Sequence, residues 1–470
     1  MINHSDIAFL ELHELAGEIR KGALTSVEVT TAMLDRIEHF ADLHAFARVT
    51  PEEALEAAAR ADAALAAGGP TGRLHGVPIA VKDLMHTAGV VAAGGMSIHA
   101  DFVPAKDATV VRGLREAGAV LLGKLTMTEG AFTQHHPSIP APRNPWNEQT
   151  WAGCSSSGSG VALAAGLCFG ATGSDTGGSI RFPASQTGIT GLKPTYGRVS
   201  KFGAYSMGAS LDHIGPMARS AKDCAYLLEA MAGPDPADPT TALAAVPAYS
   251  QMLDLTAPPR IGIDYVTYAL FDAITRKIID ETVACFVRLG WEIIEVEIPD
   301  LVAAAEAYGP LLAVETATSH RETFPARASE YGPELRGLLE QGRAVDVIEY
   351  QTCVEERLRF TGLLRRVLSK VDGLLLPAIG VAAPSISTIR RATEDPAIFT
   401  AMTLPTAPFD MSGSPTLTLP AGFTAEGSPV GVQLVGGDFD ELELLRLGVA
   451  FQRATDFHRR RPILAEAATS

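Results

Sequence analysis

The sequence predicts an α/β protein, and three observations support this prediction. Two short apolar runs bounded by glycine, VPIAV at 77–81 and AVLL at 119–122, have the pattern of buried strands. A segment with helical spacing of its apolar residues, 109–117, lies between them and completes a strand–helix–strand unit. The chain has 470 residues, 47% of them apolar, which is enough for a large buried core.

The first 70 residues favour helices. Apolar residues recur at helical spacing over 7–37, which predicts two amphipathic helices, the second capped at Thr25-Ser26. Pro51 begins an alanine-rich helix, because proline suits the first helical position and the two acids that follow suit the positive end of the helix dipole. The glycines and proline at 68–70 end that helix.

The middle of the chain alternates loops with buried segments. Residues 143–219 contain the densest glycine and serine usage, which indicates loops. Within them the small-residue run 161–165 predicts a tightly packed helix, and a further helix is expected at 221–233. Three prolines among the six residues 234–239 predict a domain boundary or a long surface loop.

From residue 260 onward the alternation of strands and helices returns. RIGID at 260–264 and WEIIEVEI at 291–298 have strand patterns, with a helix at 278–289 between them. Long amphipathic helices are then expected as far as residue 368, and the apolar run GLLLP at 373–377 restarts the strand pattern. The sequence has no internal repeat and no low-complexity tract.

Charge and cysteine usage exclude several function classes. Lys and Arg number 38 and Asp and Glu 54, and the resulting net charge of −16 repels nucleic-acid phosphates. The five cysteines are far apart and form no CxxC pair, so neither a disulfide framework nor a thiolate zinc site is expected. His135 and His136 are adjacent and therefore point in different directions, which makes them poor joint metal ligands. We expect no metal, no cofactor and no nucleic-acid partner.

Targeting signals are also missing from the sequence pattern. The N-terminal segment lacks the basic region and apolar region of a signal peptide. The longest apolar stretch, 161–173, is shorter than the roughly 18 to 20 residues that a membrane span needs. These features predict a cytoplasmic protein with no membrane span.

Two loops rich in serine and glycine contain the residues best suited to chemistry, GCSSSGSG at 153–160 and GSDTGGSIR at 173–181. Neither matches a phosphate-binding loop or the GxSxG nucleophile elbow. Gly177 and Gly178 allow several backbone N–H groups to point toward one atom, as an oxyanion hole requires, although a structural turn explains the same glycines. Lys82 ends the first predicted strand, where it is either a surface lysine or a buried amine with a lowered pKa.

Taken together, these pieces resemble the amidase signature family of serine hydrolases along nearly the whole chain. The matching blocks are LHGVPIAVKD (74–83), PRNPW (142–146), GCSSSGS (153–159), GSDTGGSIRFPA (173–184), GLKPTYGRVS (191–200), SLDHIGPMARS (210–220), GSPTLTLPAGF (413–423), PVGVQLVG (429–436) and TDFHRRRP (455–462).

The resemblance implies an α/β fold in which a large mixed β-sheet is flanked by helices on both faces. It also implies a single domain over residues 1–470. We divide that domain into an N-terminal helical segment (1–68), a core with the catalytic residues (69–233), a more divergent and largely helical pocket region (234–405) and a C-terminal segment that completes the core (406–470).

The resemblance further implies a Ser-cisSer-Lys triad. Lys82 is its lysine, Ser155 its bridging serine after a cis peptide bond, and Ser179 its nucleophile. A neutral buried amine can accept a proton through Ser155 from Ser179, and the reverse path protonates the leaving amine.

Around the nucleophile, the resemblance assigns the oxyanion amides to Thr176, Gly177 and Gly178, together with the nucleophile's own amide. Asp175 and Arg181 flank this turn and are expected to orient it through hydrogen bonds.

Cys154 departs from the family pattern, which has glycine before the bridging serine. We expect its side chain to line the substrate pocket together with Met127, and as a packed thiol with no motif base it is a weaker nucleophile candidate than Ser179. The other pocket walls are expected at 127–140 and 308–409. Three aromatic residues there suggest an apolar or aryl substrate group, although core packing explains them equally well: Phe132, Tyr308 and Phe360.

The predicted function is therefore an amidohydrolase that cleaves the C–N bond of a small apolar or aryl amide, carbamate (urethane) or ester through an acyl-Ser179 intermediate. The alternative is the glutamine-hydrolysing component of a tRNA-dependent amidotransferase, which shares the triad but needs partner surfaces and a glutamine-specific pocket. A catalytically dead binding module would lack a triad member, and all three are present. The expected partner is a small-molecule substrate, and a homodimer stays an open alternative to a monomer.

Overall fold

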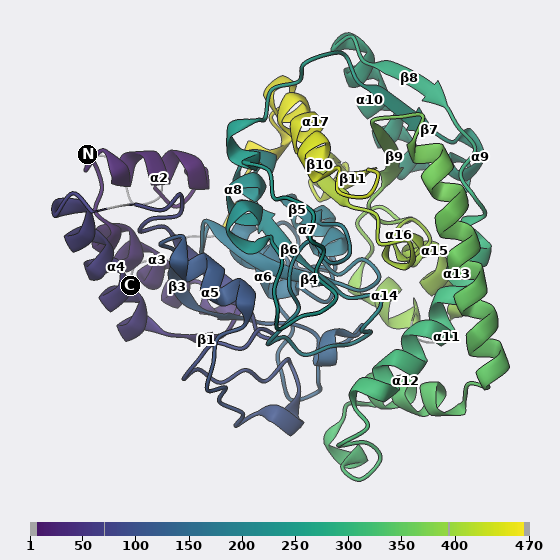
Figure 1. Ribbon diagram of the computed structural model, residues 1–470, viewed down its shortest axis with the longest axis horizontal. Coiled ribbons are helices and arrows are strands. Elements are labelled where there is room, and N and C mark those ends of the chain that lie inside the picture. The colour runs from purple at the N-terminus through teal and green to yellow at the C-terminus, as the bar shows by residue number, and fades with distance from the viewer. Residues whose placement is uncertain (1–6, 70, 393–394, 465–470) are drawn as a thin grey trace.

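Within residues 7–69, 71–392 and 395–464, which the computed structural model describes, the chain forms one mixed β-sheet of 11 strands (Figure 1). The strands lie in the order β1-β3-β2-β4-β6-β5-β10-β11-β9-β7-β8. Their bounds are Phe46–Val49 (β1), Pro78–Lys82 (β2), Val120–Leu125 (β3), Gly170–Asp175 (β4), Thr190–Lys193 (β5), His213–Ala218 (β6), Arg260–Ile263 (β7), Glu292–Glu295 (β8), Gly373–Pro377 (β9), Thr416–Phe423 (β10) and Pro429–Val435 (β11).

Two strand–helix–strand units supply the parallel pairs of the sheet. The helix α5 (Thr109–Glu116) connects β2 to the parallel β3, and α10 (Ala273–Arg288) connects β7 to the parallel β8. Both units confirm the α/β pattern that the sequence predicts. The centre of the sheet, from β4 through β6, β5, β10 and β11 to β9, is antiparallel.

The strand β2 lies between β3 and β4 and is parallel to both, with Ile79 opposite Gly170 and Ala80 opposite Ala171 of β4. Parallel neighbours end at the same edge of a sheet. The last residues of β2 and β4, Lys82 and Asp175, therefore lie at one edge, and the loops that follow meet there.

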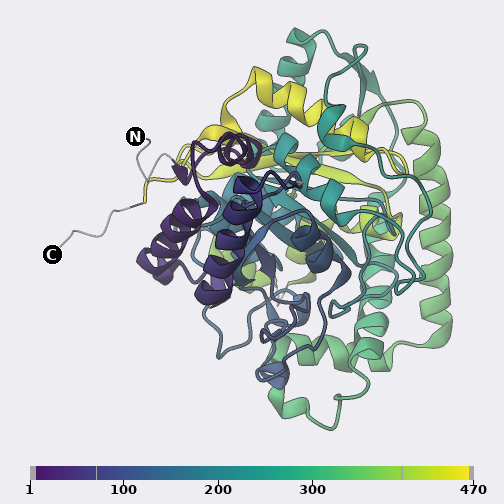
Figure 2. The same ribbon diagram turned by 60° about the vertical axis from the view of Figure 1, so that its left-hand side comes forward.

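Helices cover both faces of the sheet (Figures 1 and 2). The helices α8 and α17 contact each other and pack on β6 and β10, while α6 and α7 contact each other and pack on the same strands from the other side. Every residue of α6 and α7 is buried, so this layer is part of the core. The bounds of these helices are Ser157–Ala164 (α6), Arg181–Thr187 (α7), Ala221–Met231 (α8) and Glu441–Ala454 (α17).

The remaining helices gather at the two ends of the molecule. In Figure 1, α2, α3 and α4 lie at the purple end, and α11, α12 and α13 form a green layer at the opposite end, where α11 packs on α12, α13 and α16. Among the described helices, none is both long and apolar enough to cross a membrane. Their bounds are Leu12–Arg20 (α2), Ser26–His39 (α3), Pro51–Ala66 (α4), Tyr265–Tyr268 (α9), Leu301–Ser319 (α11), Pro333–Ala344 (α12), Val347–Leu368 (α13), Ile386–Ala392 (α14), Pro396–Thr403 (α15) and Ala407–Met411 (α16).

Most predicted elements are present, and the differences have local causes. Thr25 caps α3 as predicted, its hydroxyl accepting from the N–H of Glu28. The helix α10 begins five residues earlier than predicted because Asp272 caps it and accepts from the N–H of Thr275. The small-residue helix also begins earlier, at Ser157, and the strand predicted at 291–298 is shortened to β8.

The proline-rich segment 234–239 is not a fully exposed surface loop. Asp235 and Asp238 are buried. Asp235 accepts hydrogen bonds from the hydroxyls of Thr109 and Ser200, and Asp238 accepts one from the backbone N–H of Lys201. Because these carboxylates bind groups of the main body of the protein, they hold the loop against it.

Candidate active site

Lys82 is buried at the end of β2, and its amine contacts three serine hydroxyls. Its Nζ lies 2.6 Å from the Oγ of Ser155, 2.9 Å from that of Ser156 and 2.8 Å from that of Ser174. A neutral amine in this position can donate two hydrogen bonds and accept one, because each hydroxyl can rotate to either role. The site can therefore hold a lysine that accepts a proton.

Burial lowers the pKa of Lys82 from 10.5 to about 7, against the opposing influence of the nearby Cys154, Asp175 and Asp212. Removing the ammonium from water disfavours its charged form more than these neighbours favour it. A substantial fraction of the amine is therefore neutral near pH 7.

The loop before α6 carries Ser155 toward the loop after β4. The peptide bond between Cys154 and Ser155 is cis, as the family resemblance implies. The N–H of Ser156 donates to the backbone carbonyl of Ser179 over 3.2 Å, which joins the two loops directly. The hydroxyl that contacts Lys82 and the predicted nucleophile thus belong to neighbouring segments.

The turn that carries Ser179 is fixed by Asp175. One carboxylate oxygen of Asp175 accepts from the N–H of Gly178 over 2.6 Å, and the other accepts from the N–H of Ile180 over 2.9 Å. Gly178 has a φ of +134°, and a Cβ there would meet the ring of Phe182, so glycine is required on both counts. Its predicted role as an oxyanion donor is wrong for this structure, because its N–H is already used by Asp175.

Three other amides of the turn are free to bind an anionic oxygen. Within the described part of the chain, the N–H groups of Thr176, Gly177 and Ser179 donate to no protein acceptor. Thr176 is held by its hydroxyl, which donates to Asp212 over 2.7 Å. These three amides are the donors that remain for the predicted oxyanion hole.

Arg181 joins two buried carboxylates, those of Asp175 and Asp410. It donates to Asp175 from Nε over 3.0 Å and from Nη2 over 2.8 Å, and Nη2 also donates to Asp410. Burial alone would raise the pKa of Asp175, but the guanidinium of Arg181 outweighs it and holds that pKa well below its usual value. Asp175 and Arg181 orient the turn as predicted, since one carboxylate binds both the turn amides and the arginine.

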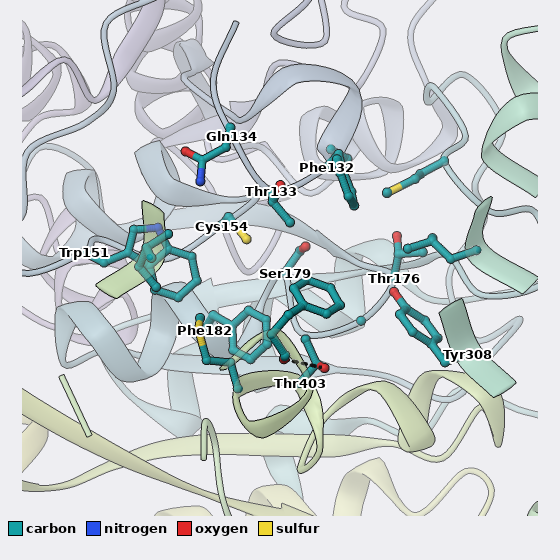
Figure 3. Close-up of a pocket in the computed structure, with 17 residues that line it drawn as sticks. Phe132, Thr133, Gln134, Trp151, Cys154, Thr176, Ser179, Phe182, Tyr308 and Thr403 are labelled. Atoms are coloured by element: carbon teal, nitrogen blue, oxygen red, sulfur yellow. Dashed lines mark hydrogen bonds between the residues drawn. The ribbon is translucent and has the colours of Figure 1, made fainter. Parts of the chain in front are cut away.

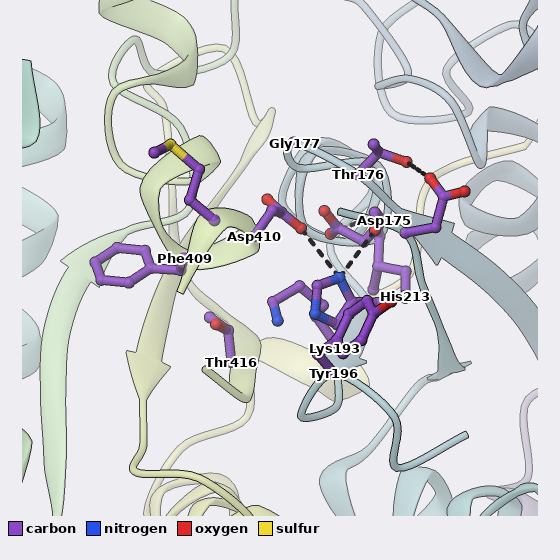
Figure 4. Close-up of polar contacts among 12 residues, drawn as sticks. Asp175, Thr176, Gly177, Lys193, Tyr196, His213, Phe409, Asp410 and Thr416 are labelled. Atoms are coloured by element: carbon purple, nitrogen blue, oxygen red, sulfur yellow. Dashed lines mark hydrogen bonds and ion pairs between the residues drawn. The ribbon is translucent and has the colours of Figure 1, made fainter. Parts of the chain in front are cut away.

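Figure 4 shows His213 beside this network, with Nδ1 3.3 Å from the carbonyl oxygen of Asp175 and 3.5 Å from Asp410. Burial lowers the pKa of His213 well below 6.5, so the ring is neutral and structural. Burial also raises the pKa of Asp410 well above its usual value, although Arg181 opposes this. Asp410 lies outside the matching sequence blocks, so no motif points to it.

A pocket opens beside Ser179 (Figure 3). Its volume is about 610 Å³ including the space open to solvent, and none of the described residues that line it is charged. Cys154 and Ser179 share one part of its wall, and Tyr308 and Thr176 face them. Most other lining residues are aromatic or aliphatic: Ala131, Phe132, Trp151, Phe182, Met207, Leu312, Ile389, Phe399 and Met402.

The predicted pocket residues divide into two groups. Phe132, Tyr308 and Cys154 line the pocket, and burial raises the pKa of the Cys154 thiol to about 12, which leaves it neutral and poorly nucleophilic. Met127 is not among the residues that line it; it is buried between Thr126, whose N–H donates to the carbonyl of Ala45, and Thr128, whose N–H donates to the carbonyl of Ser155.

Met127 instead lines a separate hollow with Phe46, Asp83 and Met96. Phe360 is also absent from the pocket wall, because it is buried in a core cluster between α13 and β9 that includes Leu364 and Leu374.

Sequence reasoning missed Ser156 and Ser174, two of the three hydroxyls around Lys82. A signal for Ser174 exists in the strand pattern. Thr172 and Ser174 are two residues apart on β4 and so share one face, where Thr172 accepts from the backbone N–H of Lys82. Hydroxyls that alternate along a strand beside a buried lysine are therefore candidate partners of its amine.

The described residues of the active site contain no metal-binding group. His135 contacts the Ser157 hydroxyl, with 3.1 Å between Nε2 and Oγ, and His136 is not part of this contact. Elsewhere in the described chain, a group with ligand spacing occurs at Glu11, His13 and Asp223. Its Asp223 already accepts from the backbone N–H groups of Leu12 and His13, so it serves to cap a helix.

The chain is similar in sequence to amidases and to related amidotransferase subunits, and in fold to amidases. The sequence model of the family described as Amidase matches residues 28–445. A protein of Mycobacterium tuberculosis named "Putative amidase AmiD" is 51% identical over 98% of this chain and 97% of its own length. A glutamyl-tRNA(Gln) amidotransferase subunit of Moorella thermoacetica is 38% identical over 98% of this chain and 100% of its own length. The crystal structure of the peptide amidase of Stenotrophomonas maltophilia superimposes with a TM-score of 0.83 at 30% identity, covering 97% of this chain and 98% of that one.

Proposed function

The chain belongs to the amidase family and is a hydrolase of carbon–nitrogen amide bonds, and we propose that it cleaves small uncharged amides with an apolar or aryl group. We further propose that Ser179 is the nucleophile and forms an acyl-enzyme, with Ser155 and Lys82 as its proton relay. The observation that carries this proposal is the buried amine of Lys82, 2.6 Å from the hydroxyl of Ser155, in a loop that is hydrogen-bonded to the segment of the pocket-lining Ser179.

In the acylation step, Ser179 Oγ attacks the carbonyl carbon while its proton passes to Ser155, whose own proton passes to Lys82. A lysine whose pKa is about 7 suits this role, because a base is most effective when its pKa is close to the working pH. The same protons then return along the relay to the leaving nitrogen, and the C–N bond breaks. Water repeats the sequence to release the acid.

The charge that develops on the carbonyl oxygen is met by backbone amides. Among the described residues, the N–H groups of Thr176, Gly177 and Ser179 lack an internal partner, and the bonds of Asp175 hold the turn that carries them. Donors fixed in this way need no reorganisation as the oxyanion forms, which is the main source of their catalytic effect.

The substrate class follows from the pocket. No charged side chain lines its described wall, which is largely aromatic and aliphatic. Glutamine would bring an ammonium and a carboxylate into this environment without partners, and burying unpaired charge is strongly unfavourable. This observation favours an apolar amide over the amidotransferase alternative, and a carbamate or ester with the same apolar group would fit the same pocket.

A panel assay tests the proposal. We expect turnover of phenylacetamide and of aryl p-nitroanilides, slower turnover of acetamide, and no measurable release of ammonia from glutamine. An aryl carbamate and an aryl ester in the same panel define which bond the enzyme prefers. Preferred hydrolysis of glutamine would overturn the proposed substrate class, and turnover that survives Ser179→Ala would overturn the proposed mechanism.

A further inference from the structure

The peptide group between Gly177 and Gly178 is held at both of its polar atoms. Its N–H, on Gly178, donates to Asp175 over 2.6 Å. Its carbonyl, on Gly177, accepts from the hydroxyl of Thr406 over 2.7 Å. A peptide group is planar, so these two bonds fix its orientation.

This peptide group lies between the two neighbouring amides of the turn that remain free. The N–H groups of Gly177 and Ser179 belong to the peptide groups on either side of it, and both lack a partner within the described residues. Holding the central peptide restricts ψ at Gly177 and φ at Gly178, two of the backbone angles that set the directions of these N–H groups. The Thr406 hydroxyl therefore acts on the predicted oxyanion donors without contacting the substrate.

Thr406 is also tied to the wall of the substrate pocket. It follows α15, whose residues Phe399, Met402 and Thr403 line the pocket. The N–H of Thr406 donates to the carbonyl of Thr403 over 2.9 Å, and its hydroxyl lies 3.1 Å from the same carbonyl.

Two further contacts hold this arrangement. Arg181 donates to the carbonyl of Thr406 over 2.9 Å, so the arginine that binds Asp175 also binds the wall segment. On the opposite side, Gly177 packs against Tyr308, since a Cβ added to Gly177 would lie 2.2 Å from the Tyr308 hydroxyl oxygen. The oxyanion turn is therefore held between two pocket-lining segments, α11 and the end of α15.

We propose that Thr406 is a positioning residue that couples the pocket wall to the oxyanion turn, holding the Gly177 carbonyl so that the adjacent amides face the reacting carbonyl. This inference rests on the proposed function. It implies that an acyl group packed against α15 helps to fix the turn, so that a good fit in the pocket raises kcat as well as lowering KM.

The test replaces only the hydroxyl. Thr406→Val keeps a branched side chain of similar size but cannot donate to Gly177. With an aryl p-nitroanilide we expect kcat to fall roughly 10-fold, the size of one neutral hydrogen bond that matters in the transition state, while KM stays within about 2-fold. The inhibition constant of a trifluoromethyl ketone, whose adduct places an anionic oxygen among the turn amides, should rise by the same factor.

Three controls separate positioning from a general structural effect. Thr406→Ser retains the hydroxyl and should restore kcat to near the wild-type value. Thr282→Val removes a buried threonine hydroxyl that donates within α10, to the carbonyl of Ile278, and should leave kcat unchanged. If Thr406→Val does not fold, Thr406→Ala gives the same comparison without the added methyl group.

Unchanged kcat in Thr406→Val, a loss confined to KM, or equal impairment of Thr406→Ser would each overturn the inference. Those results leave the proposed function intact as long as Ser179→Ala is inactive. Activity in Ser179→Ala would instead remove the proposed function on which the inference rests.

Discussion

The active site joins two regions that are built by different means. The proposed relay lies at the ends of the parallel strands β2 and β4, where Lys82, Ser174 and Asp175 are fixed by strand pairing. Apart from Cys154 and the turn that carries Ser179, the pocket wall comes mainly from α7, α11, α14 and α15 and from the loop around Phe132, with no strand among the described elements that form it. Hydrogen bonds between paired strands fix the positions of the residues at the strand ends. Side chains on the helices of the pocket wall can be substituted without shifting those strands. The strand ends thus support the proposed relay, while most of the pocket wall is supported by helices and loops.

Asp175, Arg181 and Thr406 connect these two regions. The arginine binds the carboxylate that holds the turn and also the carbonyl of Thr406 in the wall segment. If the strand ends carry the chemistry and the pocket wall the selectivity, substitutions at the strand ends should reduce turnover of every substrate. Substitutions in the wall should alter the preference among substrates.

The largest expected effect is that of Ser179→Ala. Removing the proposed nucleophile should lower kcat by more than about 10⁴-fold for all substrates, the size of loss seen in serine hydrolases, because only noncovalent stabilisation remains. The melting temperature should stay near that of the wild type, since one hydroxyl is lost. Fluorophosphonate labelling followed by mass mapping checks the assignment, and an adduct on Cys154 would contradict it.

Lys82→Arg should reduce activity almost as strongly. Arginine keeps the length and positive charge of lysine but cannot lose its proton at any accessible pH, so it cannot serve as the base. Lys82→Met, which is uncharged and of similar length, controls for the effect of charge in the buried site and should be equally inactive. Near-normal turnover by a folded Lys82→Arg enzyme would show that the lysine is structural.

The pH dependence of the wild type follows from the same group. Because the pKa of Lys82 is lowered to about 7, kcat/KM should rise with pH through that value as the free enzyme loses the proton. Stability should also rise with pH between about 7 and 10.5, because in that window the unfolded chain binds a proton that the folded one does not. Urea unfolding of the wild type and Lys82→Met at several pH values tests this. The difference between their free energies of unfolding should rise with pH across the window, because other buried lysines, such as Lys193, whose pKa is lowered to about 8, affect both proteins alike.

Ser155→Ala should lower kcat by roughly 10² to 10⁴-fold, the usual range for an element of proton transfer. Some activity should survive, because a water molecule can occupy the space of the missing hydroxyl and bridge Lys82 to Ser179. Ser156→Ala is a matched control, since its hydroxyl also contacts Lys82, at 2.9 Å, but is not the proposed bridge. Equal losses in the two variants would mean that either serine can relay the proton.

The two regions also differ in how far the sequence predicts them. Lys82, Ser155 and Ser179 lie in short blocks with fixed spacing, so their convergence at the ends of β2 and β4 could be expected. The prediction that the N–H of Gly178 is an oxyanion donor is wrong, because that N–H donates to Asp175. A sequence motif identifies the residue but does not show which acceptor its N–H binds. Met127 and Phe360 are wrongly placed in the wall for a related reason, since an apolar residue in a helix or loop can face either the core or a pocket.

The sequence predicts elements best where the pattern is local. The strand GLLLP and the cap at Thr25 are located correctly, because a buried apolar run and a capping residue act within a few positions. Asp410 and Thr406 act on residues more than 200 positions away, at Arg181 and Gly177. Contacts of that range depend on the assembled fold, and no pattern in a single sequence reveals them.

The smallest effect is expected from a substitution in the pocket wall, which is also the most direct test of whether the wall and the relay act separately. Phe132→Ala removes an aromatic ring from the pocket while leaving the strand ends untouched. Losing contact with a ring of this size costs about 1.5 kcal/mol, so kcat/KM for phenylacetamide should fall roughly 10-fold. The value of kcat/KM for acetamide should hardly change, because its methyl group is too small to reach the wall.

The control is Phe102→Ala, which removes a half-exposed ring outside the pocket and should leave both values of kcat/KM unchanged. Equal losses for both substrates in Phe132→Ala would show that the wall and the relay act as one unit, and that selectivity here cannot be altered without cost to the chemistry.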